Sequence, residues 1–386
     1  MNPAAPSVTA PAATSPAVAS TFARAGLLVY GFLIVYASLY PFADWRDMGL
    51  PCWSFLLAPL PHYWTTFDVA TNIVGYFPFG LLVVFALYPK VRGIAAAMLA
   101  ILAGTLLSGS MEALQTFLPS RVSSNLDLLA NISGTCIGAI AGLLLSRALL
   151  AQSWLLQLHR QWFVPDASHG LIVIWLWPLA QVYPEGYLFG LGQLMPLLSD
   201  WLSRWLDTPI DLEMLFRHDM LLSVQGYWLA ETIITACGLT GALLTLSCLL
   251  RRRAPRFTLM LLLVMAAFMV KALAGALVFD PGNALAWLTP GARGGLLIAT
   301  MMVAGLTFAP PVAQRRLAAV SLLLSLIAIN LVPANPYFVA TLQAWIQGKF
   351  LNFNGAARFL SLFWPVFALW FLLHPMHRVK RKREPV

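Results

Sequence analysis

Two stretches decide the fold of this chain: FDVATNIVGYFPFG, residues 67–80, and NLDLLANISGTCIGAIAG, residues 125–142. Both carry the pattern Asp-x-x-x-Asn-x-x-Gly, as Asp68/Asn72/Gly75 and, 59 positions later, Asp127/Asn131/Gly134. Each copy opens an apolar run close to the ~20 residues that a helix needs to cross a membrane. Polar and charged groups at the start of such an apolar segment are costly in hydrocarbon, so this pattern predicts either a functional site or polar side chains that pair with one another.

The composition predicts a polytopic membrane protein. The chain has 386 residues, of which 60% are hydrophobic and 10% charged, and its mean hydropathy is +0.77, whereas soluble domains carry about 25% charged residues. The net charge of +9 is scattered in small groups between apolar runs, which is typical of orientation signals and not of a nucleic-acid footprint. The four cysteines form no CxxC motif, so we expect neither a disulfide framework nor a metal site, and no cofactor.

Apolar periodicity predicts an all-α transmembrane bundle of about ten spans. The expected runs are 25–40, 69–89, 94–118, 127–150, 170–197, 221–250, 257–279, 294–310, 317–333 and 359–373. In the fifth run Pro178, Pro184 and Pro196 predict a kink or two half-helices. The domain boundaries that follow are a disordered Ala/Pro/Ser/Thr tail over 1–22, a four-span domain over 23–150, a six-span extension over 151–373 and a basic tail over 374–386.

The distribution of basic residues predicts that both termini lie in the cytoplasm. With this orientation 16 of the 24 Lys and Arg residues fall in inner loops. These are Arg24; Lys90 and Arg92; Arg147 and Arg160; Arg251, Arg252, Arg253 and Arg256; Arg315 and Arg316; and Arg378, Lys380, Arg381, Lys382 and Arg383. An even number of spans with both ends inside satisfies the positive-inside rule at every loop, so we expect a multi-pass protein of a cytoplasmic (inner) membrane.

The polar residues of the repeat are expected to gather near the outer membrane surface. Residues four apart share a helix face, which applies to Asp68 with Asn72 and to Asp127 with Asn131. The site residues expected at this pocket are Asp68, Asn72, Glu112, Gln115, Arg121, Asp127 and Asn131. The two repeat copies predict a tandem of helical hairpins, with like helix ends facing each other across the pocket.

Structural roles remain open for these residues. Asp68 and Asp127 follow hydroxyl residues and can cap helix N-termini, and the two asparagines can form interhelical hydrogen bonds. Glu112 lies inside an apolar span and needs a partner, for which Arg121 is the nearest candidate, with protonation as the alternative.

A second charged pair is expected in the later half of the chain. Glu231 and Lys271 lie at depths that differ by about one helical turn in two neighbouring spans. Because an isolated charge at that depth is expensive, we predict an intramembrane ion pair. The pair is either a structural tie or part of an ion or proton relay.

In the region of the two repeat copies the sequence resembles the VanZ-like family, named for a bacterial membrane protein of glycopeptide (teicoplanin) resistance. The resemblance covers about residues 25–150. It rests on Tyr40-Pro41-Phe42, on both repeat copies, on Tyr76, Pro78, Phe79 and Gly80, and on Glu112, Gln115, Pro119 and Arg121. It implies a compact multi-span unit of the bacterial cell envelope without an agreed biochemical activity, and it assigns no role to residues 151–386.

Three functions follow as hypotheses. The first is a non-enzymatic envelope protein whose outward pocket binds a lipid headgroup or an amphiphile, with a role in antibiotic resistance implied by the resemblance alone. The second is an intramembrane enzyme acting on a lipid-linked wall precursor, with Glu112 as general base and Asp68 and Asp127 holding a divalent cation; it is less favoured, because the sequence shows no nucleophile–base pair. The third is a transporter, indicated by the interrupted fifth run and by the Glu231/Lys271 pair. Membrane lipids are the expected partners, and nucleic acid is not.

Overall fold

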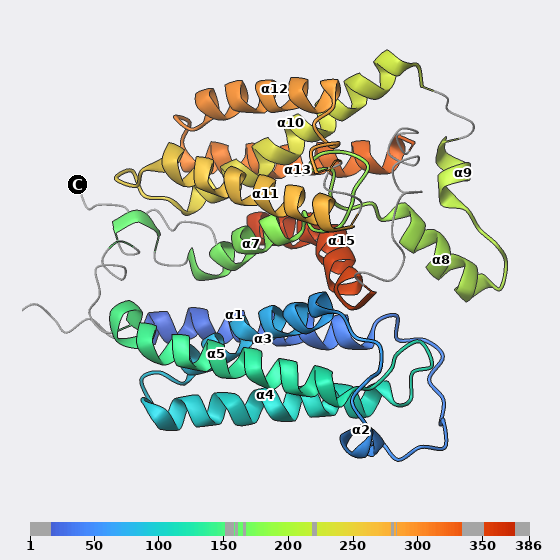
Figure 1. The fold of residues 1–386 in the computed structure, drawn as a ribbon. Helices are drawn as coiled ribbons and strands as arrows, with labels where there is room; N and C mark the ends of the chain where they lie inside the picture. Colours follow the sequence, from blue (N-terminus) through green and yellow to red (C-terminus); the bar gives the residue numbers. More distant parts are fainter. Residues whose placement is uncertain are drawn as a thin grey trace, which may run out of the picture. The chain divides into compact units, whose positions relative to one another are not determined.

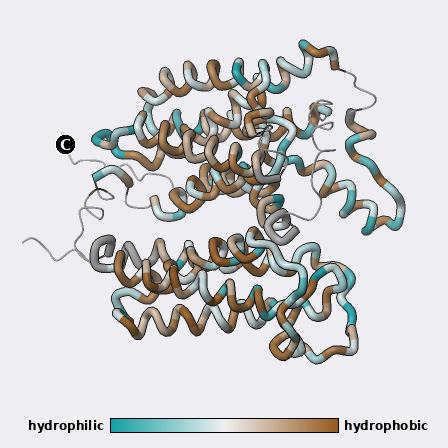
Figure 2. The backbone as a smooth tube through the Cα atoms, viewed as in Figure 1, coloured by the Kyte–Doolittle hydropathy of each residue, from teal (hydrophilic) through white to brown (hydrophobic). Residues whose placement is uncertain are grey.

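The computed structural model describes residues 17–150, 158, 161–164, 167–217, 222–278, 282, 284–333 and 351–374. Over these residues the fold is all-α, with one isolated β-bridge between Phe163 and Leu250 and no sheet (Figure 1). Figure 2 shows apolar residues along the helices and hydrophilic ones mostly in the connections. The predicted terminal tails, 1–22 and 374–386, lie outside the described residues except for 17–22 and His374.

The helices confirm a polytopic membrane protein but only part of the predicted span count. Among the described residues, eight helices are long and apolar enough to cross a membrane, and α7 and α12 are shorter apolar helices. The helices of the first part are α1 (Ala17–Leu39), α2 (Ser54–Leu57), α3 (Thr66–Leu87), α4 (Ile94–Gln115) and α5 (Asn125–Leu150). Those of the second are α7 (Ala167–Leu179), α8 (Met195–Leu206), α9 (Leu212–Arg217), α10 (Val224–Leu249), α11 (Arg256–Val278), α12 (Pro290–Leu306), α13 (Pro311–Leu331) and α15 (Leu351–Leu373).

The chain divides into two compact units. The first combines Met1–Gly31 with Arg46–Gln157, and the second combines Phe32–Trp45 with Leu158–Val386. The division after Gln157 lies close to the boundary expected from the sequence, whereas the end of α1 and the loop after it group with the later helices.

Glycines let α3 and α5 approach at backbone distance in the first unit. A Cβ atom on Gly134 would collide with the backbone of Ile73, and one on Gly138 would collide with that of Phe77. From the α3 side, Gly80 lies against the backbone of Thr135. Small residues at such positions allow the van der Waals packing that drives helix association in membranes. The α4 helix packs on both α3 and α5.

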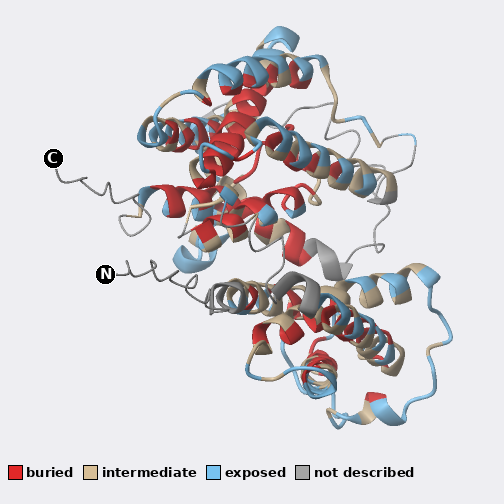
Figure 3. Cartoon of the chain, turned by 90° about the vertical axis from the view of Figure 1, so that its left-hand side faces the viewer, coloured by how far each residue is buried: buried red, intermediate tan, exposed pale blue. Residues whose placement is uncertain are grey.

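Helix α10 forms the centre of the second unit. It packs against α7, α11, α12 and α13, and most of its residues are buried. Figure 3 shows buried residues gathered inside this unit and exposed ones on its outer helix faces. Gly295 of α12 lies against Thr235, and Gly241 lies against Leu322 of α13, so small residues again set the closest approaches.

The fifth apolar run is interrupted, as its prolines predicted. Helix α7 ends at Leu179, directly after Pro178, and helical structure resumes only at Met195. The non-helical stretch between them is largely buried, with Tyr187, Leu188 and Phe189 each at most 2% exposed. The Asn330 side chain ties this stretch to α13: its oxygen accepts from the N–H groups of residues 194 and 195, at 2.8 and 3.0 Å, and its amide donates to the carbonyl of residue 192. Irregular backbone at membrane depth requires such internal partners.

The two repeat glycines provide a matched test of the α3–α5 contact. We expect Gly134→Ala to destabilise the first unit by about 1–3 kcal/mol, because the added methyl overpacks the contact with Ile73. Gly75→Ala is the control, because its Cβ would meet nothing within 4 Å, and it should be neutral or stabilise the helix by up to about 1 kcal/mol. Thermal unfolding in detergent measures both, and equal melting temperatures would contradict this packing.

Candidate functional site

A buried polar cluster lies where α3, α4 and α5 meet in the first unit. Of the residues predicted for the site, Glu112, Gln115 and Asn131 are buried, Asn72, Arg121 and Asp127 are partly buried, and Asp68 is exposed. The cluster therefore grades from exposed to buried along α3 and α5, from Asp68 and Asp127 toward Asn72 and Asn131.

Asp68 caps the N-terminus of α3. Its carboxylate accepts from the Thr65 N–H at 3.2 Å and from the Thr65 hydroxyl at 2.7 Å, while the Thr65 hydroxyl accepts from the Asp68 N–H at 3.1 Å. This reciprocal arrangement is a capping box. The capping role that the sequence left open is thus observed for Asp68.

Asp127 is engaged across the helices. The Asn72 amide donates to Asp127 Oδ1 at 2.9 Å, so the asparagine of the first repeat copy binds the aspartate of the second. The Asp127 backbone N–H lies 3.3 Å from the Ser124 hydroxyl, which caps α5. One residue therefore both opens α5 and ties it to α3.

Asn131 takes a different partner from its counterpart in the repeat. Its amide donates to the Ser108 hydroxyl of α4 at 2.9 Å, and Ser108 is fully buried. The two repeat copies are therefore similar in sequence but not in contacts.

Glu112 binds the start of α5. Its Oε2 accepts from the Ser124 N–H at 2.8 Å, which satisfies one of the free N–H groups at a helix N-terminus. The carboxylate is only 4% exposed. The predicted pair of Glu112 with Arg121 stays a prediction, and burial lowers the pKa of the Arg121 guanidinium.

One polar atom inside this cluster, Asn131 Oδ1, has no hydrogen-bond partner, and the hydrogen-bonding neighbour of the Tyr76 hydroxyl is Ser108. Both side chains are about 94% buried, since each is 6% exposed. The polar neighbours of the Tyr76 hydroxyl are Ser108, Glu112 and Tyr30, and Tyr30 itself donates to the Gly75 carbonyl at 2.7 Å. A buried polar atom without a partner calls for a water or a ligand group.

Sequence reasoning missed several members of the cluster. Ser108, Ser124 and Tyr30 were not singled out, and Tyr76 entered only through the family resemblance. Hydroxyl residues are common in membrane helices, where they bind their own backbone, as Thr105 does to the carbonyl of residue 101. The usable signal was the spacing of Ser108 and Glu112, which are four apart and thus share a face of α4.

The second unit holds the other predicted pair, and its two members have different polar neighbours. Glu231 is a residue of α10, and its side chain faces the start of α12, where its hydrogen-bond partners are Thr289 and the backbone of Ala292. The charged neighbour of Lys271 is Glu185, in the non-helical stretch after α7. The charge of Lys271 therefore acts on Glu185, and the predicted pair with Glu231 stays a prediction. Glu185 also accepts a hydrogen bond from the Ser361 hydroxyl of α15.

The described residues contain no group of three or more His, Cys, Asp or Glu side chains that could hold a metal ion. The acidic residues of the first unit are instead engaged by polar partners: Asp68 by Thr65, Asp127 by Asn72 and Glu112 by Ser124.

Comparison with known families identifies the N-terminal part of the chain. Residues 12–146 match the model of the VanZ/LLP1 family, so this part of the chain is a VanZ/LLP1 domain, which confirms the resemblance seen in the sequence. The matched range contains all seven residues of the cluster that were predicted from the sequence. No curated protein and no solved structure matches the chain.

The cross-copy hydrogen bond can be measured by a double-mutant cycle. Asn72→Ala and Asp127→Ala remove the two ends of one bond, and we expect a coupling energy of about 0.6 kcal/mol, up to ~1.7, as for polar pairs in other membrane proteins. The control is the pair that a symmetric repeat would form, Asp68→Ala with Asn131→Ala, whose members have other partners. Its coupling should be near zero, and the reverse order of the two energies would refute the observed pairing.

Proposed function

We propose that this VanZ-like protein of the bacterial cytoplasmic membrane binds the headgroup of a lipid or amphiphile in the polar cluster of its first unit, on the outward-facing side. The proposal includes ten crossings, with α7 and α12 as short spans, a tandem of similar hairpins in the first four and both termini in the cytoplasm. The positive-inside distribution of Lys and Arg supports this orientation.

One observation carries the proposal: the buried Asn131 Oδ1 has no hydrogen-bond partner, in a cluster that also holds the Tyr76 hydroxyl and the buried Glu112. Asn131 Oδ1 can only accept a hydrogen bond, whereas the Tyr76 hydroxyl can donate or accept. A ligand hydroxyl can bond with both, which favours a hydroxyl-bearing headgroup such as a sugar or glycerol moiety.

The charged residues supply the rest of the recognition. Arg121 is partly buried in the connection between α4 and α5, where a guanidinium can bind an anionic headgroup with two parallel hydrogen bonds. Asp127 remains partly exposed and can accept from hydroxyl or ammonium groups. A glycopeptide with a lipid tail belongs to the same ligand class, and a role in antibiotic resistance is proposed only through this class.

We favour binding over catalysis for Glu112, because its Oε2 accepts from the Ser124 N–H and so gives this side chain a structural role at the start of α5. A general base would have to act through the other carboxylate oxygen, Oε1. An enzyme acting on a lipid-linked wall precursor remains the alternative, and turnover of such a precursor would establish it.

Native mass spectrometry of the protein released gently from its membrane tests the binding role. We expect a hydroxyl-bearing anionic lipid to copurify with the wild type, to be absent from Arg121→Ala and to be reduced in Tyr76→Phe, which removes one hydroxyl only. Arg46→Ala is the control, because Arg46 is an exposed residue of the same unit in a predicted outer loop. Bulk phospholipid in equal amounts in all four proteins would refute the proposal and leave the cluster as a packing network.

The second unit supports transport as a second candidate function. Its non-helical stretch after α7 is buried in the bundle and carries Glu185, which is 6% exposed and acted on by the charges of Lys271 and Arg358. In the same stretch, Gln181 Oε1 is buried without a partner. Transporters place ion and substrate sites at such broken helices.

Proteoliposomes containing a pH-sensitive dye separate this candidate from a purely structural role. If the stretch carries protons, an imposed pH gradient should decay faster with wild type than with empty vesicles, and Glu185→Gln should abolish the difference. Glu231→Gln is the matched control, because Glu231 lies in the same unit but binds the start of α12. Equal decay with all proteins and with empty vesicles would exclude proton movement through Glu185.

A further inference from the structure

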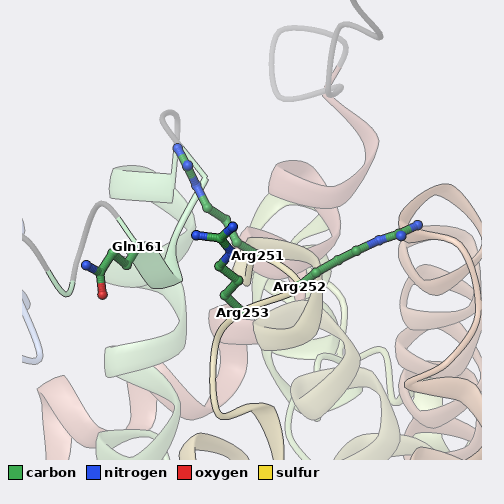
Figure 4. Close-up of a pocket in the computed structure, with 4 residues that line it drawn as sticks. All are labelled: Gln161, Arg251, Arg252 and Arg253. Atoms are coloured by element: carbon green, nitrogen blue, oxygen red, sulfur yellow. The ribbon is translucent and has the colours of Figure 1, made fainter.

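The turn between α10 and α11 carries a basic hollow that the VanZ/LLP1 domain does not include. The hollow has a volume of about 350 Å³ and is lined by Gln161, Arg251, Arg252 and Arg253. Figure 4 shows Arg251 and Arg253 between Gln161 and Arg252, which extends to the opposite side. All four residues are exposed, and the lining holds three guanidinium groups, an amide and no carboxylate.

Backbone hydrogen bonds hold the two sides of this hollow together. The Arg251 N–H donates to the Trp162 carbonyl at 2.7 Å, and the Val164 N–H donates to the Leu249 carbonyl at 2.9 Å. The Arg251 side chain adds a bond from Nε to the Phe163 carbonyl at 2.7 Å. Hydrogen bonds between two segments far apart in sequence therefore hold the walls of the hollow in place.

Other arginines near this turn have structural partners. Arg256 donates to the carbonyls of Thr307 and Leu250, and Arg315 donates to carbonyls at the C-terminal end of α15, among them Phe371 and His374. Cations at these places complement the carbonyls left free at helix ends. Arg252 and Arg253 instead extend from an exposed turn, where like charges on neighbouring residues repel each other unless an anion lies between them.

We propose that the Gln161/Arg251–Arg253 hollow binds the phosphate headgroup of an anionic phospholipid in the inner leaflet. Guanidinium groups bind phosphate oxygens in a bidentate manner, and Gln161 can donate to a further oxygen. The positive-inside rule predicts that this turn lies at the cytoplasmic surface, where anionic lipids attract basic segments. The hollow belongs to the second unit and does not depend on the ligand proposed for the first.

Lipid binding to the full-length protein tests the proposal. Native mass spectrometry of detergent-solubilised protein, titrated separately with phosphatidylglycerol and with phosphatidylcholine, should show preferential binding of phosphatidylglycerol to wild type. Arg252→Ala/Arg253→Ala should weaken that binding by about twenty-five-fold, since each basic residue near an anionic surface contributes roughly fivefold. Arg252→Lys/Arg253→Lys keeps the positive charge but loses the planar guanidinium group, so its affinity for phosphatidylglycerol should lie between those of the wild type and the double alanine variant.

The matched control is Lys90→Ala/Arg92→Ala, which removes the same charge from another turn expected on the inner face. This variant should bind phosphatidylglycerol as the wild type does. Equal weakening in both double alanine variants would overturn the proposal, because it would show attraction to net charge alone. The proposal would also be overturned if millimolar inorganic phosphate displaced the lipid and protected the wild type, but not the Arg252→Ala/Arg253→Ala variant, against unfolding. That result would show a site for a soluble anion.

Discussion

The close approach of α3 and α5 is the constraint on which the polar cluster of the first unit depends. Asparagine and aspartate side chains are short, so Asn72 reaches Asp127 at 2.9 Å only if the two helix backbones nearly touch. The glycines at 134 and 138 on α5 provide that approach. In the second repeat copy, Gly134 thus brings the helices together so that the polar residues of the two copies can pair.

The repeat shows what local sequence determines and what it leaves to the surroundings. The pattern correctly predicted that Asp68 and Asp127 stand at the first turns of α3 and α5, and that each shares a face with its asparagine. It could not predict the partners. Only the second copy has Ser108 of α4 beside its asparagine, and only the second copy has a glycine pressed on the opposite backbone, because Gly75 faces open space. Duplicated local structure becomes asymmetric through the neighbours that tertiary packing supplies.

The limits of sequence reasoning are equally physical in the second unit. Residue counting estimates how deep a charge lies along a helix, but it does not say toward which neighbour the side chain points. Glu231 and Lys271 were therefore matched in depth, whereas in the structure the charged group that acts on Lys271 is Glu185. Sequence analysis did not single out Glu185, because hydropathy does not distinguish a helix from non-helical backbone. The run from 170 to 197 is largely apolar, yet helix α7 ends at Leu179. Prolines predicted the break but not that the broken stretch would be buried and held by Asn330.

The basic residues illustrate the same difference between a count and a contact. The positive-inside rule treats Arg252, Arg253, Arg256 and Arg315 alike, as charges that orient a loop. In the structure Arg256 and Arg315 are structural groups that bind backbone carbonyls near helix ends, and they would be needed whichever side of the membrane they faced. Arg252 and Arg253 are exposed residues of a turn and line a hollow whose lining contains no carboxylate. Their charge is therefore directed outward from the fold, and recognition of an external anion has to be sought in these groups.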